Sequence, residues 1–107
     1  MRIPILFGTP PYSDDAVLAE EGQIVPHAGY TLRFSRPVTS GHPFGCTCCT
    51  LRSPAAEALT RLFHARATGA APFFRRVVVL ASPAGQTAVR EAATGDVMTA
   101  ARYRLAL

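Results

Sequence analysis

The sequence predicts an α/β domain with a small, partly parallel sheet and flanking helices. Three observations support this prediction. A short apolar run, Ile3–Phe7, is stopped by a glycine and two prolines, as a buried strand would be. A helical pattern with a strong start signal begins at Ser53. A β-branched run over residues 76–81 lies between prolines and is typical of a strand in the middle of a sheet.

The segments between these landmarks are assigned in chain order. Residues 14–21 are expected to form one or two helical turns, and residues 23–25 could pair at a sheet edge. Tyr30–Phe34 alternates as a half-buried strand does, with its aromatic and leucine side chains on one face. A turn-rich segment over residues 35–50 follows, so the chain leaves this strand through a long loop.

The helix at Ser53 is the clearest element. The Ser53 hydroxyl can cap free amides, Pro54 suits the first helical position, and Gly69 supplies a stop. Apolar residues recur between them at helical spacing: Ala55, Ala58, Leu59, Leu62 and Phe63. Residues 86–93 are also helical in composition, and Asp96 can cap a final helix that runs toward Tyr103.

Composition indicates one folded domain spanning residues 1–107, because 49% of the residues are hydrophobic and only 17% are charged. The net charge of +4 comes from eleven arginines scattered along the chain, which does not predict nucleic-acid binding. Only residues 73–76 approach such a footprint, and the two arginines there are expected to be the solvated start of a strand. Asp14 and Asp15 are likewise expected to be solvated, at a helix start.

Hydropathy predicts no membrane partner. No apolar stretch reaches the roughly 18 residues of a membrane span, and the N-terminus does not resemble a secretion signal, so a cytoplasmic protein is expected.

Three cysteines, Cys46, Cys48 and Cys49, carry the clearest chemical signal. An odd number within four positions cannot form a disulfide framework, and in a reducing compartment such a cluster indicates metal or thiol chemistry. Zinc prefers four ligands, so three thiolates leave a fourth place for water, a histidine or a partner's side chain. His42 is the nearest candidate in the chain, whereas His27 and His64 are more distant in sequence.

Other interpretations of the cluster remain open. Copper(I) also favours thiolates. The positive end of the helix that starts at Ser53, together with Arg52, would lower the cysteine pKa, which suits a redox switch as well as a metal ligand. Inert packing is a further alternative, as is an enzyme that uses Cys48 or Cys49 as nucleophile with His42 or His64 as base.

Residues 45–52, Gly-Cys-Thr-Cys-Cys-Thr-Leu-Arg, resemble the hallmark loop of the CobW-like GTPase and metallochaperone family. Residues 56–66, 74–79 and 83–105 resemble the helix, core strand and following stretch of that family, so the resemblance covers about residues 32–105. It implies a single partial P-loop GTPase (CobW-like) domain over residues 1–107 with thiolate metal ligands.

The parts that would handle a nucleotide do not match the family. A phosphate-binding loop needs a lysine and the guanine-reading motif needs an asparagine, but the chain contains neither. Leu80 stands where the family carries an acidic residue. We therefore expect that the protein binds no nucleotide, hydrolyses none and is not an enzyme. The expected function is a zinc-binding protein or metallochaperone accessory that meets a protein acceptor or forms a homo-oligomer; the alternative is a pseudo-GTPase interaction module.

Overall fold

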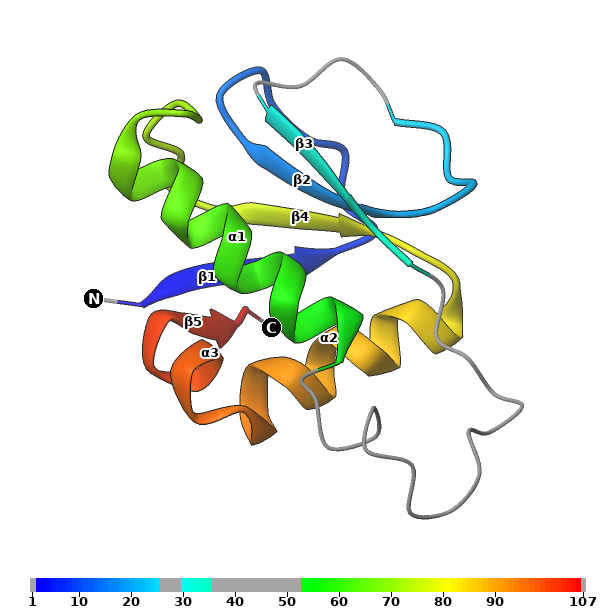
Figure 1. Ribbon diagram of the computed structural model, residues 1–107. Coiled ribbons are helices and arrows are strands. Elements are labelled where there is room, and N and C mark those ends of the chain that lie inside the picture. Colours follow the sequence, from blue (N-terminus) through cyan, green and yellow to red (C-terminus); the bar gives the residue numbers. More distant parts are fainter. Residues whose placement is uncertain (1, 26–29, 36–52, 107) are drawn as a thin grey trace.

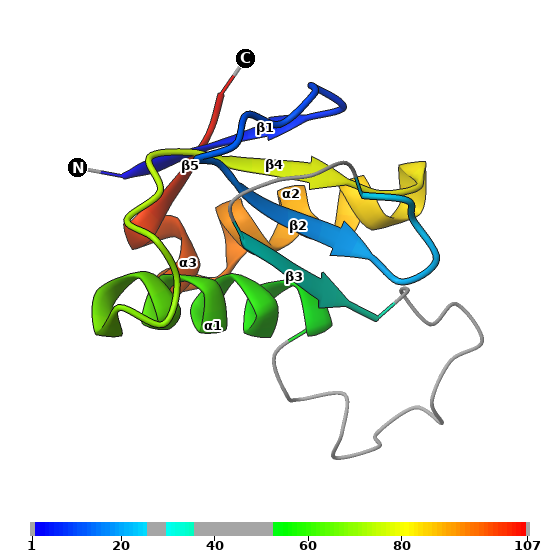
Figure 2. The same cartoon turned by 90° about the horizontal axis from the view of Figure 1, so that it is seen from above.

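The computed structural model describes residues 2–25, 30–35 and 53–106. Within these ranges the chain forms a five-stranded parallel sheet, ordered β3-β2-β4-β1-β5, with three helices packed on one face (Figure 1, Figure 2). The elements in chain order are β1 (Ile3–Phe7), β2 (Ala16–Glu20), β3 (Tyr30–Phe34), α1 (Pro54–Thr68), β4 (Val77–Leu80), α2 (Pro83–Gly95), α3 (Val97–Arg102) and β5 (Tyr103–Leu105). The predicted α/β class is confirmed, but the sheet is wholly rather than partly parallel in these ranges.

The predicted helical turns over residues 14–21 are wrong, because this segment contains β2. Alanine, leucine and glutamate give the segment a helical composition, but β2 pairs with β3 on one side and with β4 on the other. All five of its residues are buried, so tertiary pairing overrides local propensity. Residues 23–25 form no strand. The predicted central strand is confirmed as β4, which pairs with β1 and β2.

The direction of each crossover explains why the helices share one face. The chain moves from β3 through α1 to β4, and from β4 through α2 and α3 to β5, always in the same direction across the sheet. The step from β1 to β2 runs in the opposite direction and contains no helix. Because parallel crossovers are right-handed, residues 8–15 return across the other face. That face is therefore covered in part by irregular chain.

The predicted helix from Ser53 is confirmed as α1. The Ser53 Oγ accepts a hydrogen bond from the Ala56 amide at 3.2 Å, and Gly69 ends the helix with a φ of 84° that favours glycine. The predicted later helices are confirmed as α2 and α3, although the last helix stops at Arg102 because Tyr103 begins β5.

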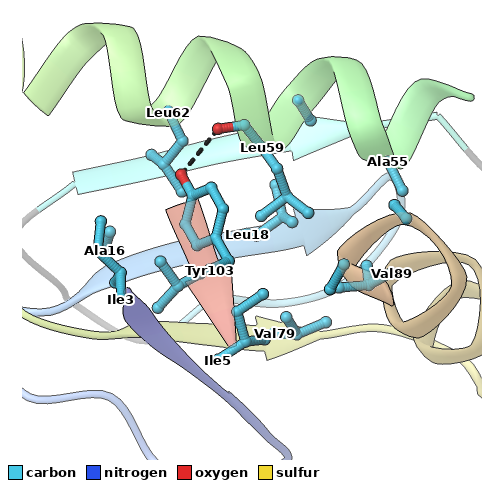
Figure 3. Close-up of a cluster of buried hydrophobic side chains, with 14 of the residues drawn as sticks. Ile3, Ile5, Ala16, Leu18, Ala55, Leu59, Leu62, Val79, Val89 and Tyr103 are labelled. Atoms are coloured by element: carbon cyan, nitrogen blue, oxygen red, sulfur yellow. Dashed lines mark hydrogen bonds between the residues drawn. The ribbon is translucent and has the colours of Figure 1, made fainter. Parts of the chain in front are cut away.

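The core lies between the sheet and the helices, and Tyr103 is its largest fully buried side chain. Its hydroxyl donates a hydrogen bond to the Leu59 carbonyl at 2.7 Å, which joins β5 to the middle of α1 (Figure 3). Burial raises the pKa of this hydroxyl, so the group stays protonated and remains a donor. Ile5, Leu18 and Val79 surround it from the strands (Figure 3).

A partly buried ion pair fixes the return from β1 to β2. The Arg76 Nε lies 2.9 Å from both carboxylate oxygens of Asp15, whose side chain is 5% exposed. The Arg76 Nη2 lies 2.8 Å from Asp15 Oδ2 but makes no hydrogen bond, so this contact is a charge contact. Arg76 also stacks over the Tyr12 ring at 4.2 Å. The prediction that Asp15 is solvated is therefore wrong.

Candidate functional site

The predicted metal ligands Cys46, Cys48, Cys49 and His42 lie outside the described residues, as does His27. What the structure does give is the two ends of the segment that carries the ligands. Residues at the end of β3 and the start of α1 line one small hollow of about 110 Å³: Arg33, Phe34, Ser35, Pro54, Glu57, Ala58 and Arg61. The two ends thus lie side by side, at the edge of the sheet where the parallel strands finish.

The carboxyl edge is a favourable place for a site. In open parallel sheets, ligands bind outside the carboxyl ends of the strands, where loops converge. Here the edge also receives the amino end of α1, whose aligned peptide dipoles favour negative charge. Cys49 precedes the Ser53 cap by only four positions in the sequence. A thiolate near that cap would be stabilised by the helix.

Two carboxylates lie beside the Ser53 cap. A hollow of about 330 Å³ between α1 and α2 is lined by Ser53, Ala56, Ala88, Glu91, Ala92, Gly95 and Asp96. Asp96 Oδ2 accepts a hydrogen bond from the Thr99 hydroxyl at 3.0 Å, whereas Glu91 is exposed. Carboxylate oxygens, like cysteine sulfur, can be zinc ligands. Oxygen ligands are thus present next to one end of the cysteine segment.

Glu20 places a buried carboxylate at the same edge of the sheet. Its burial was not predicted from the sequence. It ends β2, is only 1% exposed, and accepts hydrogen bonds from the Ser82 amide and hydroxyl at 3.1 Å each. Ser82 in turn caps α2, because its Oγ accepts a bond from the Gly85 amide at 3.2 Å. The signal in the sequence was an acidic residue directly after an apolar run. Glu20 holds the α2 start against the sheet.

Gly85 leaves room for this carboxylate, and the first testable prediction concerns it. A Cβ at Gly85 would lie 2.6 Å from Glu20 Oε2 and 2.9 Å from the Ala81 Cβ. Gly85→Ala is therefore expected to lower the free energy of unfolding by about 1–2 kcal/mol in urea denaturation, although glycine to alanine in a helix ordinarily stabilises by about 0.5–1 kcal/mol.

Gly95→Ala is the matched control, because a Cβ there meets nothing within 4 Å at the end of the same helix. That variant should equal or slightly exceed the wild type in stability. Equal stability of the two variants would show that the Glu20 carboxylate moves aside at no cost, and would contradict a fixed role for it.

His64 is described, and it lies far along α1. Eleven residues separate it from Ser53, which corresponds to about 16 Å along the helix axis. Its side chain is exposed. It therefore lies well away from the end of α1 that the cysteine segment joins, and no described residue hydrogen-bonds to its imidazole to support its use as a base.

Within residues 2–25, 30–35 and 53–106, no three His, Cys, Asp or Glu side chains gather closely enough to hold a metal ion. No described helix is long and apolar enough to cross a bilayer. No family model, curated protein or solved structure matches the chain. The CobW-like resemblance therefore stays a prediction that depends on the residues quoted for it.

Proposed function

We propose that the chain is a small cytoplasmic metal-binding protein, with zinc as the preferred ion, that uses Cys46, Cys48 and Cys49 as thiolate ligands. The observation that supports this most directly is the cluster itself, three cysteines within four positions in a segment rich in glycine and proline. The ends of that segment lie side by side at the carboxyl edge of a parallel sheet. One end also joins a capped helix start.

The fourth coordination place is left for exchange. Three thiolates do not complete the tetrahedral set that zinc prefers, so water, His42 or a ligand from another protein would occupy the remaining place. An acceptor that supplies a cysteine or histidine there could take the ion without any hydrolysis. This is the chemistry of a metallochaperone accessory.

Two features of the described fold support the absence of a nucleotide reaction. A phosphate-binding loop joins a strand to a helix, whereas the chain passes from β1 to β2 without one. The central strand β4 ends at Leu80 and is followed by Ala81 and Ser82, so the strand itself supplies no carboxylate for a magnesium ion, and the nearby Glu20 carboxylate is bonded to the Ser82 amide and hydroxyl. Together with the missing lysine, these features favour a metal-binding protein without a nucleotide-driven step.

The test is the metal content of protein purified without an affinity tag, measured by mass spectrometry. The wild type is expected to carry about one zinc ion per chain or per pair of chains, and the Cys46→Ser, Cys48→Ser, Cys49→Ser triple variant none. His42→Ala tests the fourth ligand, with His64→Ala as the matched control. Circular dichroism should show that the triple variant keeps its fold. A metal-free wild type with reduced, unreactive thiols would overturn the proposal.

A second candidate is a pseudo-GTPase interaction module, and the open edge of β3 favours it. In the described part of the chain, β3 pairs only with β2, so its other side presents backbone groups that can pair with another chain. A second copy of this chain or a full-length CobW-like protein could add a strand there. The triple serine variant separates the two functions, since partner binding or self-association that survives it would favour the module.

A further inference from the structure

A hollow lined by arginines lies at the amino ends of the strands, opposite the edge where β3 ends and α1 begins. We call it the arginine hollow; its volume is about 470 Å³ and it is lined by Arg2, Ile3, Pro4, Arg66, Phe73, Arg75 and Arg104. These residues come from the start of β1, the last turn of α1, the approach to β4, and β5. In Figure 1 these segments lie on the side of the molecule where the N-terminus is marked.

The charge of the arginine hollow is of one sign. Four arginines line it, and no acidic residue does so among the residues that the structure describes. The guanidinium groups of Arg75 and Arg104, both exposed residues, make no hydrogen bond or ion pair with any described residue. Arg2 and Arg66 each give a donor to a backbone carbonyl, Ala100 at 3.3 Å and Phe74 at 2.7 Å. Within residues 2–25, 30–35 and 53–106, most of these guanidinium donors have no partner and could bind a ligand.

A bound anion would reduce the repulsion among the positive charges of the arginine hollow. Four positive groups around one hollow repel one another, and a bound anion replaces that repulsion by charge-assisted hydrogen bonds. The planar fork of arginine matches the oxygen pairs of phosphate and carboxylate, and phosphate offers oxygens in several directions at once. The four arginines come from four different segments of the chain, so a phosphate group, whose oxygens point in several directions, suits them better than a planar carboxylate does.

The remaining lining is apolar. The Phe73 ring is 72% exposed and is held by Arg66, whose guanidinium carbon lies 3.7 Å from the ring centroid. Ile3 and Pro4 add aliphatic surface. An exposed ring beside a cation site favours a ligand with an apolar or aromatic part next to its phosphate. The volume falls within the roughly 300–1,000 Å³ typical of small-molecule pockets, which favours a small molecule over a polymer.

We propose that the arginine hollow binds a phosphorylated small molecule, a phosphate monoester whose organic part packs against Phe73. Arg75 and Arg104 bind the phosphate through their guanidinium groups. Arg66 binds it through its terminal nitrogens, because its Nε already donates to the Phe74 carbonyl. The hollow lies at the opposite end of the strands from the end of β3 and the start of α1, between which the cysteines stand in the sequence, so binding is expected not to depend on metal. Salt should weaken it, because the attraction acts between partly exposed charges.

The test is isothermal titration calorimetry at low ionic strength with phenyl phosphate as the probe. Phenyl phosphate is expected to bind, and the Arg75→Gln, Arg104→Gln double variant should weaken this binding about tenfold or more. Arg90→Gln is the matched control: it removes the charge of an exposed arginine that stacks on Phe7 outside the hollow, and should change the affinity less than about twofold. The triple serine variant should bind as the wild type does.

Three results would overturn the proposal. Equal weakening by Arg90→Gln would show a general effect of net charge rather than a site. Inorganic phosphate that binds as tightly as phenyl phosphate would remove the role given to Phe73 and identify the free ion as the ligand. A short acidic peptide that binds when phenyl phosphate does not would indicate a protein partner. Near-native circular dichroism of the double variant is required for each comparison.

Discussion

Replacing Tyr103 by alanine is expected to lower the free energy of unfolding by about 4 kcal/mol in urea denaturation. The side chain is fully buried where β5 meets α1, and its removal leaves a cavity beside Leu59 and Phe63. Neighbouring helices and strands fill such a cavity only in part. The loss of stability therefore exceeds the free energy of transferring the side chain to water. For a domain of this size, about 4 kcal/mol is a large share of the total stability.

Tyr103→Phe separates the ring from the hydroxyl. This variant keeps the packing but removes the donor to the Leu59 carbonyl, so it should cost only about 1 kcal/mol. A loss from Tyr103→Phe as large as that from Tyr103→Ala would show that the hydrogen bond, rather than the packing of the ring, fixes β5. Near-equal stability of wild type and Tyr103→Ala would contradict the core described above.

Removing the carboxylate of the Asp15 and Arg76 ion pair is the second large perturbation. Asp15→Ala is expected to cost about 3 kcal/mol, the low end of the range for breaking a buried pair, because the Arg76 side chain keeps 21% exposure. The Tyr12 amide, which donates to Asp15 Oδ2 at 2.7 Å, would lose its acceptor as well. Asp14→Ala is the control: that side chain is exposed, and its loss should change stability by less than about 0.5 kcal/mol.

The same pair gives a pH dependence with a definite sign. Burial alone would raise the pKa of Asp15, but hydrogen bonds from Arg76 and the Tyr12 amide, together with the charge of Arg76, hold it below the ordinary value of 3.8. The folded state then binds fewer protons than the unfolded state. The stabilisation is therefore fully present above about pH 4 and is lost as the pH falls through the lowered folded-state pKa.

Urea denaturation of wild type and Asp15→Asn at several pH values measures this contribution. The stability difference between them should stay constant from about pH 7 to pH 5 and shrink below about pH 4. A difference that persists unchanged at pH 2 would contradict the charge-based explanation and assign the effect to packing.

The sequence predicted best the elements whose signals are local. Ser53 and Pro54 predict the start of α1, because a capping serine and a first-turn proline act within one helical turn. The run of β-branched residues in β4 predicts a strand whatever it pairs with. β2 was missed because its alanine, leucine and glutamate favour a helix until strands on both sides pair with it. The three residues of β5 are too few to show a period.

The two candidate sites, at opposite ends of the strands, also differ in how local their sequence signals are. Cys46, Cys48 and Cys49 are neighbours in the chain, so a site could be predicted from them without any fold. Arg2, Arg66, Arg75 and Arg104 are scattered along the chain and gave no signal of a cluster, yet the parallel sheet brings their segments to one edge. The burial of Glu20 was missed for the same reason, because its hydrogen-bond partner Ser82 follows β4 and is distant in sequence.

The place of β1 in the sheet affects the order in which the chain can assemble. Among the described strands, β1 is made first but pairs with β4 and β5, the last two in the sequence, through contacts such as Ile5 with Val77 and Ile3 with Tyr103. During synthesis its apolar edge therefore has no native partner until most of the chain has left the ribosome. Closing such long loops slows folding, and an unpaired strand edge can pair with other chains. Protection of β1 during synthesis would thus increase the yield of folded protein.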